Sequence, residues 1–339
     1  MTVSSPLPRL RLIRPTTVDA AVAARAESPQ HEWLAGGTDL LVNLRRGLLA
    51  PPALIDLSGI TELEEIRATG DRTRIGALVR LARLAEDPVI AGRHAALREA
   101  AASVAAPGHR RLATIGGNLC LQTRCIYFNQ SAWWRAANGA CLKSGGEVCH
   151  VAPEGKRCHA AFSGDVAPAL IALDAEIEIA GPSGRRRVAC ADLYHEEGRA
   201  HLRLDPGEIL TAIEVATSTD RTGYLKERVR RSFDFPLAGV AIACRVEHGG
   251  LSALRVAVTG TNSRPLLIDG TAALLGRPVD ESVLAAVEKL VAKQVRPMRT
   301  TLFPANHRRS VAAALARRLL GALSAPDATS ARAHPGVIA

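Results

Sequence analysis

Residues 31–41 read HEWLAGGTDLL, and this stretch indicates how the first part of the chain folds. Its apolar start predicts a strand that ends at Leu34, its paired glycines predict a tight turn, and the apolar spacing from Leu40 to Leu49 predicts a helix. The neighbouring segments continue this alternation, with a strand and a capped helix in 9–26 and further strands at 53–57 and 73–77. Short units that alternate in this way are typical of an α/β fold.

The pattern changes near Phe235, where strands followed by two helices predict a separate α+β domain. Residues 324–339 read as a disordered tail. The other predicted elements are a mostly helical stretch at 78–106 that ends by Gly108, a glycine turn at 113–119, a capped helix at 163–173, strands at 175–179, 187–188, 209–215 and 264–267, and helices at 281–291 and 307–323.

Length and charge narrow the functional classes. The chain has 339 residues, which suits two or three domains of about 150 residues each. Its formal net charge is +10, but Lys and Arg are scattered and do not alternate with aromatic residues, which argues against nucleic-acid binding. No apolar stretch reaches about 18 residues, so no membrane span is expected. The arginines at 9, 11 and 14 interrupt any signal peptide, so we expect a cytoplasmic protein.

Two glycine pairs are candidate phosphate-binding turns. Gly36-Gly37-Thr38 and Gly116-Gly117-Asn118 can each present backbone N–H groups to phosphate oxygens. Neither belongs to a G-x-G-x-x-G or G-x-x-x-x-G-K-[ST] motif. A single Gly-Gly pair is more often a plain turn than a phosphate site. The indication of phosphate binding comes from the presence of two such turns in one chain, because a ligand with two phosphates could bridge them.

Five of the seven cysteines lie between positions 120 and 158. A cytoplasmic location disfavours disulfides. Zinc sites prefer short C-x₂₋₄-C pairs, and only Cys120 and Cys125 are spaced in that way. An iron–sulfur cluster tolerates wider spacing, and the nearby aromatic and basic residues would exclude water and offset its charge. Buried, chemically inert thiols suit Cys190 and Cys244, which lie in apolar runs.

Six motifs in one order resemble the FAD-binding subunit of the molybdenum hydroxylases, the family of xanthine dehydrogenase and carbon monoxide dehydrogenase. They are AGGTDLL (35–41), IGALVRLARL (75–84), ATIGGNL (113–119), SGDVAPAL (163–170), DPGEIL (205–210) and YLKERVRRSFDFPLAGVA (224–241). The resemblance implies a multi-domain α/β and α+β fold. It consists of an FAD-binding domain of the p-cresol methylhydroxylase and vanillyl-alcohol oxidase (PCMH/VAO) type with two α/β subdomains (1–70 and 71–234), and an α+β domain of the carbon monoxide dehydrogenase flavoprotein type (235–323).

Most members of this family run directly from the GGN turn into the next helix, whereas this chain inserts about 40 residues at about 120–162. The insertion resembles that of the β subunit of 4-hydroxybenzoyl-CoA reductase, which carries a [4Fe-4S] cluster there. Its C-x₁₅-C-x₇-C-x₈-C spacing implies Cys125, Cys141, Cys149 and Cys158 as cluster ligands and leaves Cys120 as a non-ligand beside the flavin turn.

The resemblance also implies which residues contact FAD. At one of these positions some relatives have an aromatic residue, whereas this chain has Val104. For three others the sequence also permits a purely structural role: Asp165 could cap a helix, Lys226 could be a solvated strand residue, and Leu210 could belong to the core. The full set is Trp33, Leu34, Ala35, Gly36, Gly37, Thr38, Asp39, Leu40, Val104, Ala113, Thr114, Gly116, Gly117, Asn118, Asp165, Leu210 and Lys226.

The implied function is electron transfer without substrate chemistry in this chain, so no catalytic residue is assigned. The implied partners are a large molybdenum subunit and a small [2Fe-2S] subunit in a dimer of heterotrimers, with reduced ferredoxin as donor and a phenolic thioester reduced in the large subunit. Three alternatives stay open: an FAD subunit of another molybdenum hydroxylase, a zinc-stabilised assembly module, and a stand-alone flavin oxidoreductase.

Overall fold

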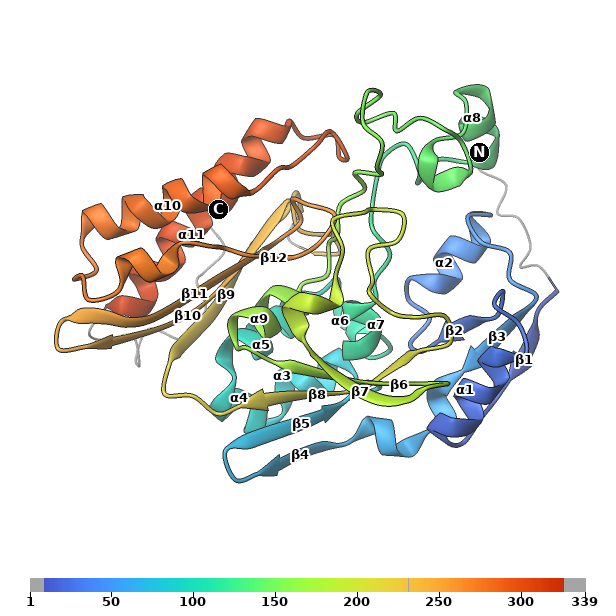
Figure 1. Ribbon diagram of the computed structural model, residues 1–339, viewed down its shortest axis with the longest axis horizontal. Helices are drawn as coiled ribbons and strands as arrows, with labels where there is room; N and C mark the ends of the chain where they lie inside the picture. The colour runs from blue at the N-terminus through green and yellow to red at the C-terminus, as the bar shows by residue number, and fades with distance from the viewer. Residues whose placement is uncertain (1–8, 231, 326–339) are drawn as a thin grey trace.

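The computed structural model describes residues 9–230 and 232–325, and these form three sheets with their covering helices (Figure 1). The first sheet is parallel, in the order β1-β3-β2, and it packs with the first helix in the N-terminal subdomain. Thr17 starts that helix because its hydroxyl accepts a hydrogen bond from the N–H of Ala20 at 3.2 Å. These elements are β1 (Arg11–Ile13), α1 (Val18–Ala26), β2 (Glu32–Leu34), α2 (Leu40–Arg45), β3 (Ala53–Asp56), η1 (Leu57–Gly59) and η2 (Thr61–Glu64).

The second sheet is antiparallel, in the order β4-β5-β8-β6-β7, and helices cover one of its faces (Figure 1). Ile75, Ile177 and Ile213 point from three neighbouring strands into the apolar core beneath these helices. The elements are β4 (Ile66–Thr69), β5 (Arg72–Gly76), α3 (Leu81–Glu86), α4 (Pro88–Arg93), α5 (Ala95–Ser103), α6 (Pro107–Arg110), α7 (Ile115–Leu119), α9 (Val166–Ala172), β6 (Glu176–Gly181), β7 (Gly184–Ala189), η4 (Cys190–Leu193) and β8 (Ile209–Ala216).

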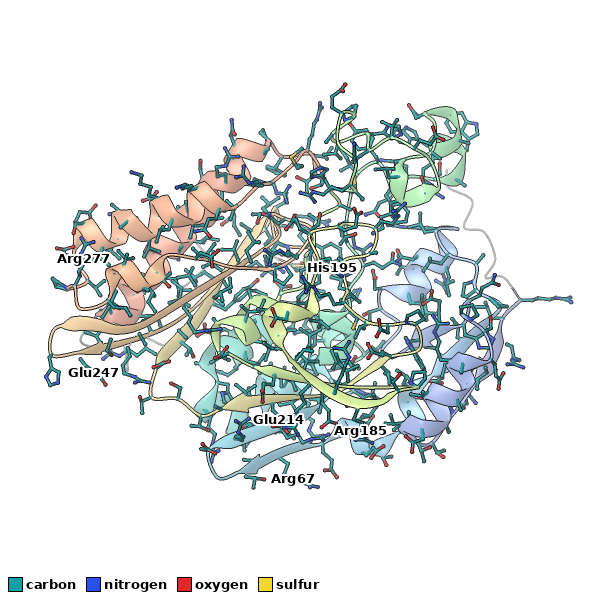
Figure 2. The ribbon with its side chains drawn as sticks, viewed as in Figure 1. Arg67, Arg185, His195, Glu214, Glu247 and Arg277 are labelled. Atoms are coloured by element: carbon teal, nitrogen blue, oxygen red, sulfur yellow. The ribbon has the colours of Figure 1, made fainter. Side chains whose placement is uncertain are left out.

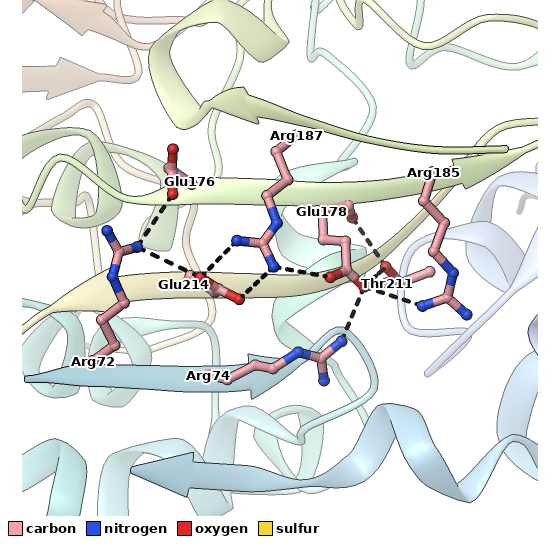
Figure 3. Close-up of polar contacts among 8 residues, drawn as sticks. All are labelled: Arg72, Arg74, Glu176, Glu178, Arg185, Arg187, Thr211 and Glu214. Carbon is pink, nitrogen blue, oxygen red and sulfur yellow. Dashed lines mark hydrogen bonds and ion pairs between the residues drawn. The ribbon is translucent and has the colours of Figure 1, made fainter. Parts of the chain in front are cut away.

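The other face of this sheet carries a network of cross-strand ion pairs (Figure 3). Glu214 on β8 binds Arg187 of β7 at 2.9 Å and Arg72 of β5 at 3.5 Å. Glu178 on β6 binds Arg74 of β5 at 2.9 Å. Strand residues alternate between faces, so the isoleucines fill the core while the charged residues between them face outwards.

The third sheet, in the order β12-β11-β10-β9, packs against two long helices that form a separate core. Strand β9 pairs with β10 although it precedes residue 235, so the C-terminal sheet begins upstream of the position where the sequence pattern changes. The elements are β9 (Arg221–Glu227), β10 (Ala238–Glu247), β11 (Gly250–Thr259), β12 (Leu266–Leu267), η5 (Thr271–Leu274), α10 (Glu281–Gln294) and α11 (Ala305–Ser324). Side chains fill the space between these layers (Figure 2).

The cysteine-rich insertion leaves and rejoins the second subdomain at one point. Arg124 and Ala161 exchange two backbone hydrogen bonds of 2.7 Å, which form an antiparallel bridge at the base of the insertion. The insertion contains α8 (Ala132–Ala137) and η3 (Leu142–Ser144), and it projects beside α2 (Figure 1). The N–H of Ile126 donates to the carbonyl of Thr300 at 2.9 Å, which ties the insertion to the C-terminal domain as well.

Two local predictions were wrong. Gly108 does not end the preceding helix; it lies inside α6, which begins at Pro107 because a proline is favourable in a first helical turn. The segment 113–119 is not a plain glycine turn but contains the whole of the short helix α7, which Thr114 caps. Of the predicted tail, residues 326–339 lie outside the described residues. Within the described part of the chain, no helix is both long and apolar enough to cross a membrane.

Candidate functional site: two adjoining cavities

The first cavity has a volume of about 810 Å³ and lies between the N-terminal and second subdomains. Both glycine pairs border it, although about 80 residues separate them in the sequence. Of the predicted flavin contacts, fifteen lie on its wall: Trp33, Ala35, Gly36, Gly37, Thr38, Asp39, Leu40, Val104, Ala113, Thr114, Gly116, Gly117, Asn118, Asp165 and Leu210.

The two glycine turns touch at Gly36. A Cβ atom on Gly36 would lie 2.0 Å from the carbonyl oxygen of Leu112 and 3.0 Å from the Cα of Ala113. Only glycine therefore lets the two turns approach this closely. Gly37 has a φ of +71°, a left-handed conformation that disfavours any side chain. A Cβ on Gly37 would meet the side chains of Leu41 and Leu34, so this glycine is required by the turn itself.

The second turn is built around hydrogen bonds that the side chains of Thr114 and Asn118 accept. The Thr114 hydroxyl accepts from the N–H of Gly117 at 3.1 Å and caps α7. The side-chain oxygen of Asn118 accepts from the N–H of Val166 at 3.2 Å, so Asn118 supports the start of α9. These bonds fix the short helix at the cavity wall, with its N-terminal end beside the first glycine turn.

Asp165 immediately precedes α9 and lines the cavity, but its side chain does not cap that helix. Its carboxylate accepts a 2.7 Å hydrogen bond from the hydroxyl of Tyr224 and pairs with Lys226 at 3.0 Å. Burial raises the pKa of Asp165 and lowers the pKa of Lys226. Lys226 also donates to the carbonyl of Ser103 at 3.1 Å. Lys226 and Leu34 are the two predicted contacts that are absent from the cavity wall, and Lys226 lies behind Asp165.

The cavity wall includes residues that the sequence did not single out. His201 is buried, has a Nε2 atom without a hydrogen-bond partner, and has a pKa lowered to about 4 by burial. His109 makes an edge-on contact with Phe233 at 5.3 Å between ring centroids. Arg124, at the base of the insertion, forms an ion pair with Asp39 in the first glycine turn. No local pattern marks these residues, because each reaches the cavity only through the fold.

A second cavity lies inside the insertion, and four thiols line it. Cys125, Cys141, Cys149 and Cys158 all face this cavity, together with aromatic and apolar side chains of Tyr127, Phe128, Leu142, Val151 and Ala160. Each of the four cysteines is less than one-tenth exposed. All seven cysteines of the chain lie in the described residues and all are free, so the structure contains no disulfide.

The donor set of this cavity is four thiols, which both structural zinc sites and iron–sulfur clusters use. Among the described residues, no three His, Cys, Asp or Glu side chains form a group that could hold one metal ion. A zinc ion draws its ligands to about 2.3 Å from one centre, whereas a cluster binds each thiolate through a different iron. Burial raises the pKa of Cys158 to about 11 and also raises that of Cys125, so positive charge is needed to hold these groups as thiolates.

The other cysteines lie elsewhere. Cys120 borders the first cavity rather than the second, and burial raises its pKa to about 12. Cys190 is buried in the core of the second subdomain, and Cys244 in the core of the C-terminal domain. The four cysteines with the C-x₁₅-C-x₇-C-x₈-C spacing are therefore the ones that converge on the second cavity.

Lys143 lines both cavities. Its Nζ donates to the carbonyls of Thr123 at 3.0 Å and Gly198 at 3.2 Å, and it also contacts the Thr123 hydroxyl. Burial lowers the pKa of Lys143 to about 8, while the neighbouring Cys158 acts in the opposite direction. Gly198 lies in the loop between His195, which Figure 2 labels, and His201. The same loop therefore contacts Lys143 through Gly198 and supplies His201 to the wall of the first cavity.

Comparison with known protein families supplies the identity of the larger cavity. Residues 8–217 match the model of the FAD-binding domain in molybdopterin dehydrogenase, and residues 223–323 match the carbon monoxide dehydrogenase flavoprotein C-terminal domain. The chain belongs to this family of FAD-binding subunits. It is therefore an FAD-binding oxidoreductase subunit.

Individual relatives agree with this assignment. The chain is 33% identical to the aldehyde oxidoreductase FAD-binding subunit PaoB of Escherichia coli (strain K12), over 77% of this chain and 84% of that protein. It is 28% identical to the carbon monoxide dehydrogenase medium chain of Afipia carboxidovorans, over 90% of this chain and 93% of that one. The fold matches a carbon monoxide dehydrogenase structure from Hydrogenophaga pseudoflava with a TM-score of 0.78 at 25% identity, covering 94% and 98% of the two chains. The predicted fold class, an FAD-binding domain followed by a flavoprotein C-terminal domain, is thus confirmed.

Proposed function

We propose that this FAD-binding subunit also carries a [4Fe-4S] cluster and transfers electrons between the cluster and FAD inside a molybdenum hydroxylase complex. The observation that carries the proposal is the convergence of four buried thiols on one cavity that shares Lys143 with the FAD cavity. When bound, FAD exchanges one or two electrons and an iron–sulfur cluster exchanges one, so the pair can connect two-electron and one-electron steps.

The residues around the thiols have the properties that a cluster site needs. The N–H of Ala160 donates to the sulfur of Cys158 at 3.4 Å, and the hydroxyl of Ser144 donates to the sulfur of Cys141 at 3.4 Å. Hydrogen bonds to the sulfurs stabilise the thiolate form and raise the reduction potential of a cluster. The aromatic ring of Phe128 and the side chain of Val151 keep water away from the same cavity.

The FAD cavity offers matching support for the dinucleotide. The backbone N–H groups of the first glycine turn can donate to pyrophosphate oxygens. In the second turn, the N–H groups of residues 115–118 already donate to acceptors within the protein, so this turn supports the cavity wall instead of binding the phosphates through these groups. We assign the fifteen predicted residues on the cavity wall to FAD contact, with Lys226 acting through Asp165. The unpaired Nε2 of His201 adds a further polar group that a bound flavin could satisfy.

Metal and flavin content of the protein purified without oxygen tests this proposal. We expect one FAD, four iron and four sulfide per chain. Cys149→Ser should abolish iron and leave FAD bound, while Cys190→Ala, a buried thiol outside the cavity, should leave both unchanged. Protein that contains zinc and no iron would contradict the cluster and favour a zinc-stabilised module.

The partners and substrate follow from the family and are proposals of the same kind. We expect a large molybdenum subunit and a small [2Fe-2S] subunit, assembled as a dimer of heterotrimers. The insertion favours a 4-hydroxybenzoyl-CoA reductase that receives electrons from reduced ferredoxin, and the identity with PaoB favours an aldehyde substrate as the second candidate.

Assays of the purified complex separate these two substrates. Ferredoxin-dependent loss of the phenolic hydroxyl of 4-hydroxybenzoyl-CoA would support the reductase. Oxidation of aromatic or aliphatic aldehydes without turnover of the thioester would overturn that substrate and leave the electron-transfer role intact. Turnover of NADH by the isolated chain would instead indicate a stand-alone flavin oxidoreductase.

A further inference from the structure

We propose that Lys143 places a fixed positive charge between the two cofactors and raises the reduction potential of the cluster. The inference depends on the cluster of the proposed function and adds the residue that sets its potential. Lys143 follows the cluster ligand Cys141 by two residues, and its ammonium group lies in the wall shared by both cavities.

The ammonium group of Lys143 is held in this wall by neutral partners. It donates to the backbone carbonyls of Thr123 and Gly198, contacts the Thr123 hydroxyl, and lies 4.9 Å from the ring centroid of Phe128. Contact with carbonyl oxygens and an aromatic face stabilises a cation without cancelling its charge. The charge is therefore fixed in position rather than carried on a mobile side chain.

Two other cations near the cavities, Arg124 and Arg157, are paired with carboxylates. Arg124 is paired with Asp39, and Arg157 with Glu196 at 3.4 Å. Within residues 9–230 and 232–325, Lys143 forms no ion pair with Asp or Glu. Among the described residues that line the thiol cavity, Lys143 is the one Lys or Arg, and no Asp or Glu lies on the same lining.

This arrangement must affect the two oxidation states of the cluster unequally. A cluster bound by four thiolates is negatively charged, and reduction adds one more electron. A nearby positive charge stabilises the more negative form more strongly, and the low dielectric of a buried site enhances the effect. Lys143 therefore makes reduction of the cluster more favourable.

Substitutions at Lys143 test the charge separately from the hydrogen bonds. Lys143→Gln keeps an N–H donor and removes the charge, and Lys143→Arg keeps both. We expect Lys143→Gln to decrease the equilibrium constant for cluster reduction at least tenfold, which is about 59 mV for a one-electron couple. Lys143→Arg should stay within twofold of wild type. The readout is a redox titration of the anoxic complex followed by electron paramagnetic resonance, with iron and FAD content measured in parallel.

Lys156→Gln is the matched control, because Lys156 lies two residues from Cys158 in the same insertion but is exposed to solvent. Water and salt screen exposed charges, so its loss should change the equilibrium constant less than twofold. Equal shifts in Lys143→Gln and Lys156→Gln would overturn the proposal, because they would show that the position of Lys143 has no special effect.

A second pair of variants covers the case in which Lys143→Gln does not assemble. Thr123→Asp places a carboxylate beside the ammonium group while the amine remains, and Thr123→Asn is its uncharged control. We expect the Asp variant alone to lower the potential. An unchanged potential in Thr123→Asp overturns the role of Lys143, whereas absence of iron in the wild-type protein refutes the cluster itself.

Discussion

Asp165 and Lys226 form an ion pair of 3.0 Å in which each side chain is only 4% exposed. The pair connects the wall of the FAD cavity to β9 of the C-terminal sheet, since Asp165 lies at the start of α9 and Lys226 lies on β9. The charge on Asp165 is therefore compensated from behind the cavity, which leaves the cavity side of the carboxylate free to face a ligand.

Removal of one partner of this ion pair should strongly destabilise the folded protein. We expect Lys226→Met to lower the free energy of unfolding by about 3–5 kcal/mol, because it leaves a buried carboxylate without its cation. The double variant Asp165→Asn/Lys226→Met should recover part of that loss. Urea denaturation provides the measurement, and Glu65→Gln, which breaks the exposed pair with Arg67, should cost less than about 1 kcal/mol. Equal losses of unfolding free energy in Lys226→Met and Glu65→Gln would contradict this prediction.

The contact between the glycine turns predicts a loss of flavin in Gly36→Ala. The new Cβ would overlap the carbonyl oxygen of Leu112, so the two turns must separate and the phosphate-binding surface must widen. Flavin absorbance per chain measures the result, and we expect at least a tenfold weaker retention of FAD. Gly92→Ala is the control, since a Cβ on this exposed residue of α4 meets no atom within 4 Å. Full flavin content in Gly36→Ala would refute the assignment of this turn.

The Arg124–Asp39 ion pair predicts that the insertion and the first glycine turn depend on each other. Burial lowers the pKa of Arg124 to about 10, and it remains charged at neutral pH. We expect Asp39→Asn to leave this buried cation unpaired and to loosen both segments. Limited proteolysis should then cut the insertion at least several-fold faster, and FAD should be lost more readily. Unchanged cleavage rates with reduced FAD would mean that Asp39 acts on the flavin alone.

Two buried histidines predict a loss of stability in acid. Burial lowers the pKa of His94 and of His201 to about 4, whereas an unfolded histidine titrates near 6.5. The unfolded state therefore binds more protons between these values, and stability falls as the pH decreases from about 6.5 to about 4. Each histidine can contribute up to about 3 kcal/mol across this range.

Unfolding of a His94 variant at several pH values checks this contribution. His94 accepts or donates a 2.9 Å hydrogen bond with the hydroxyl of Thr73, and His94→Gln can keep such a bond without titrating. We expect the variant to show a shallower decline of stability below pH 6.5 than wild type. Identical slopes in the two proteins would show that His94 is not responsible.

Much of this molecule could be predicted from local sequence. Thr17 reveals the start of α1 because capping depends on a few neighbouring residues. The resemblance of the insertion to a known subunit, rather than local pattern, singled out the four cysteines that line one cavity. The Gly116-Gly117 turn was harder, because the Thr114 cap turns it into a helix. Strand β9 was missed as the start of the C-terminal sheet, since its partner β10 supplies the pairing that its own sequence does not indicate.

The basic residues of the insertion were expected to offset the charge of a cluster, but the contacts that connect the two cavities could not be predicted, for a physical reason. Lys143, Arg124 and His201 come from three separate segments, and each acquires its role from partners distant in the sequence. Lys226 is a different case, because its predicted flavin contact stays a prediction. Its motif indicated a flavin contact, but the register of β9 turns its side chain towards Asp165 and the carbonyl of Ser103.

The bridge between Arg124 and Ala161 brings the two ends of the insertion together at the surface of the second subdomain. A segment with adjacent ends can be excised and replaced by a tight hairpin without moving the strands and helices that it leaves. The insertion, and with it the proposed cluster site, is thus a transplantable module. Grafting residues 125–160 onto a relative that binds FAD alone would test whether the site can be moved, and the matching deletion in this chain keeps Arg124 and its ion pair with Asp39.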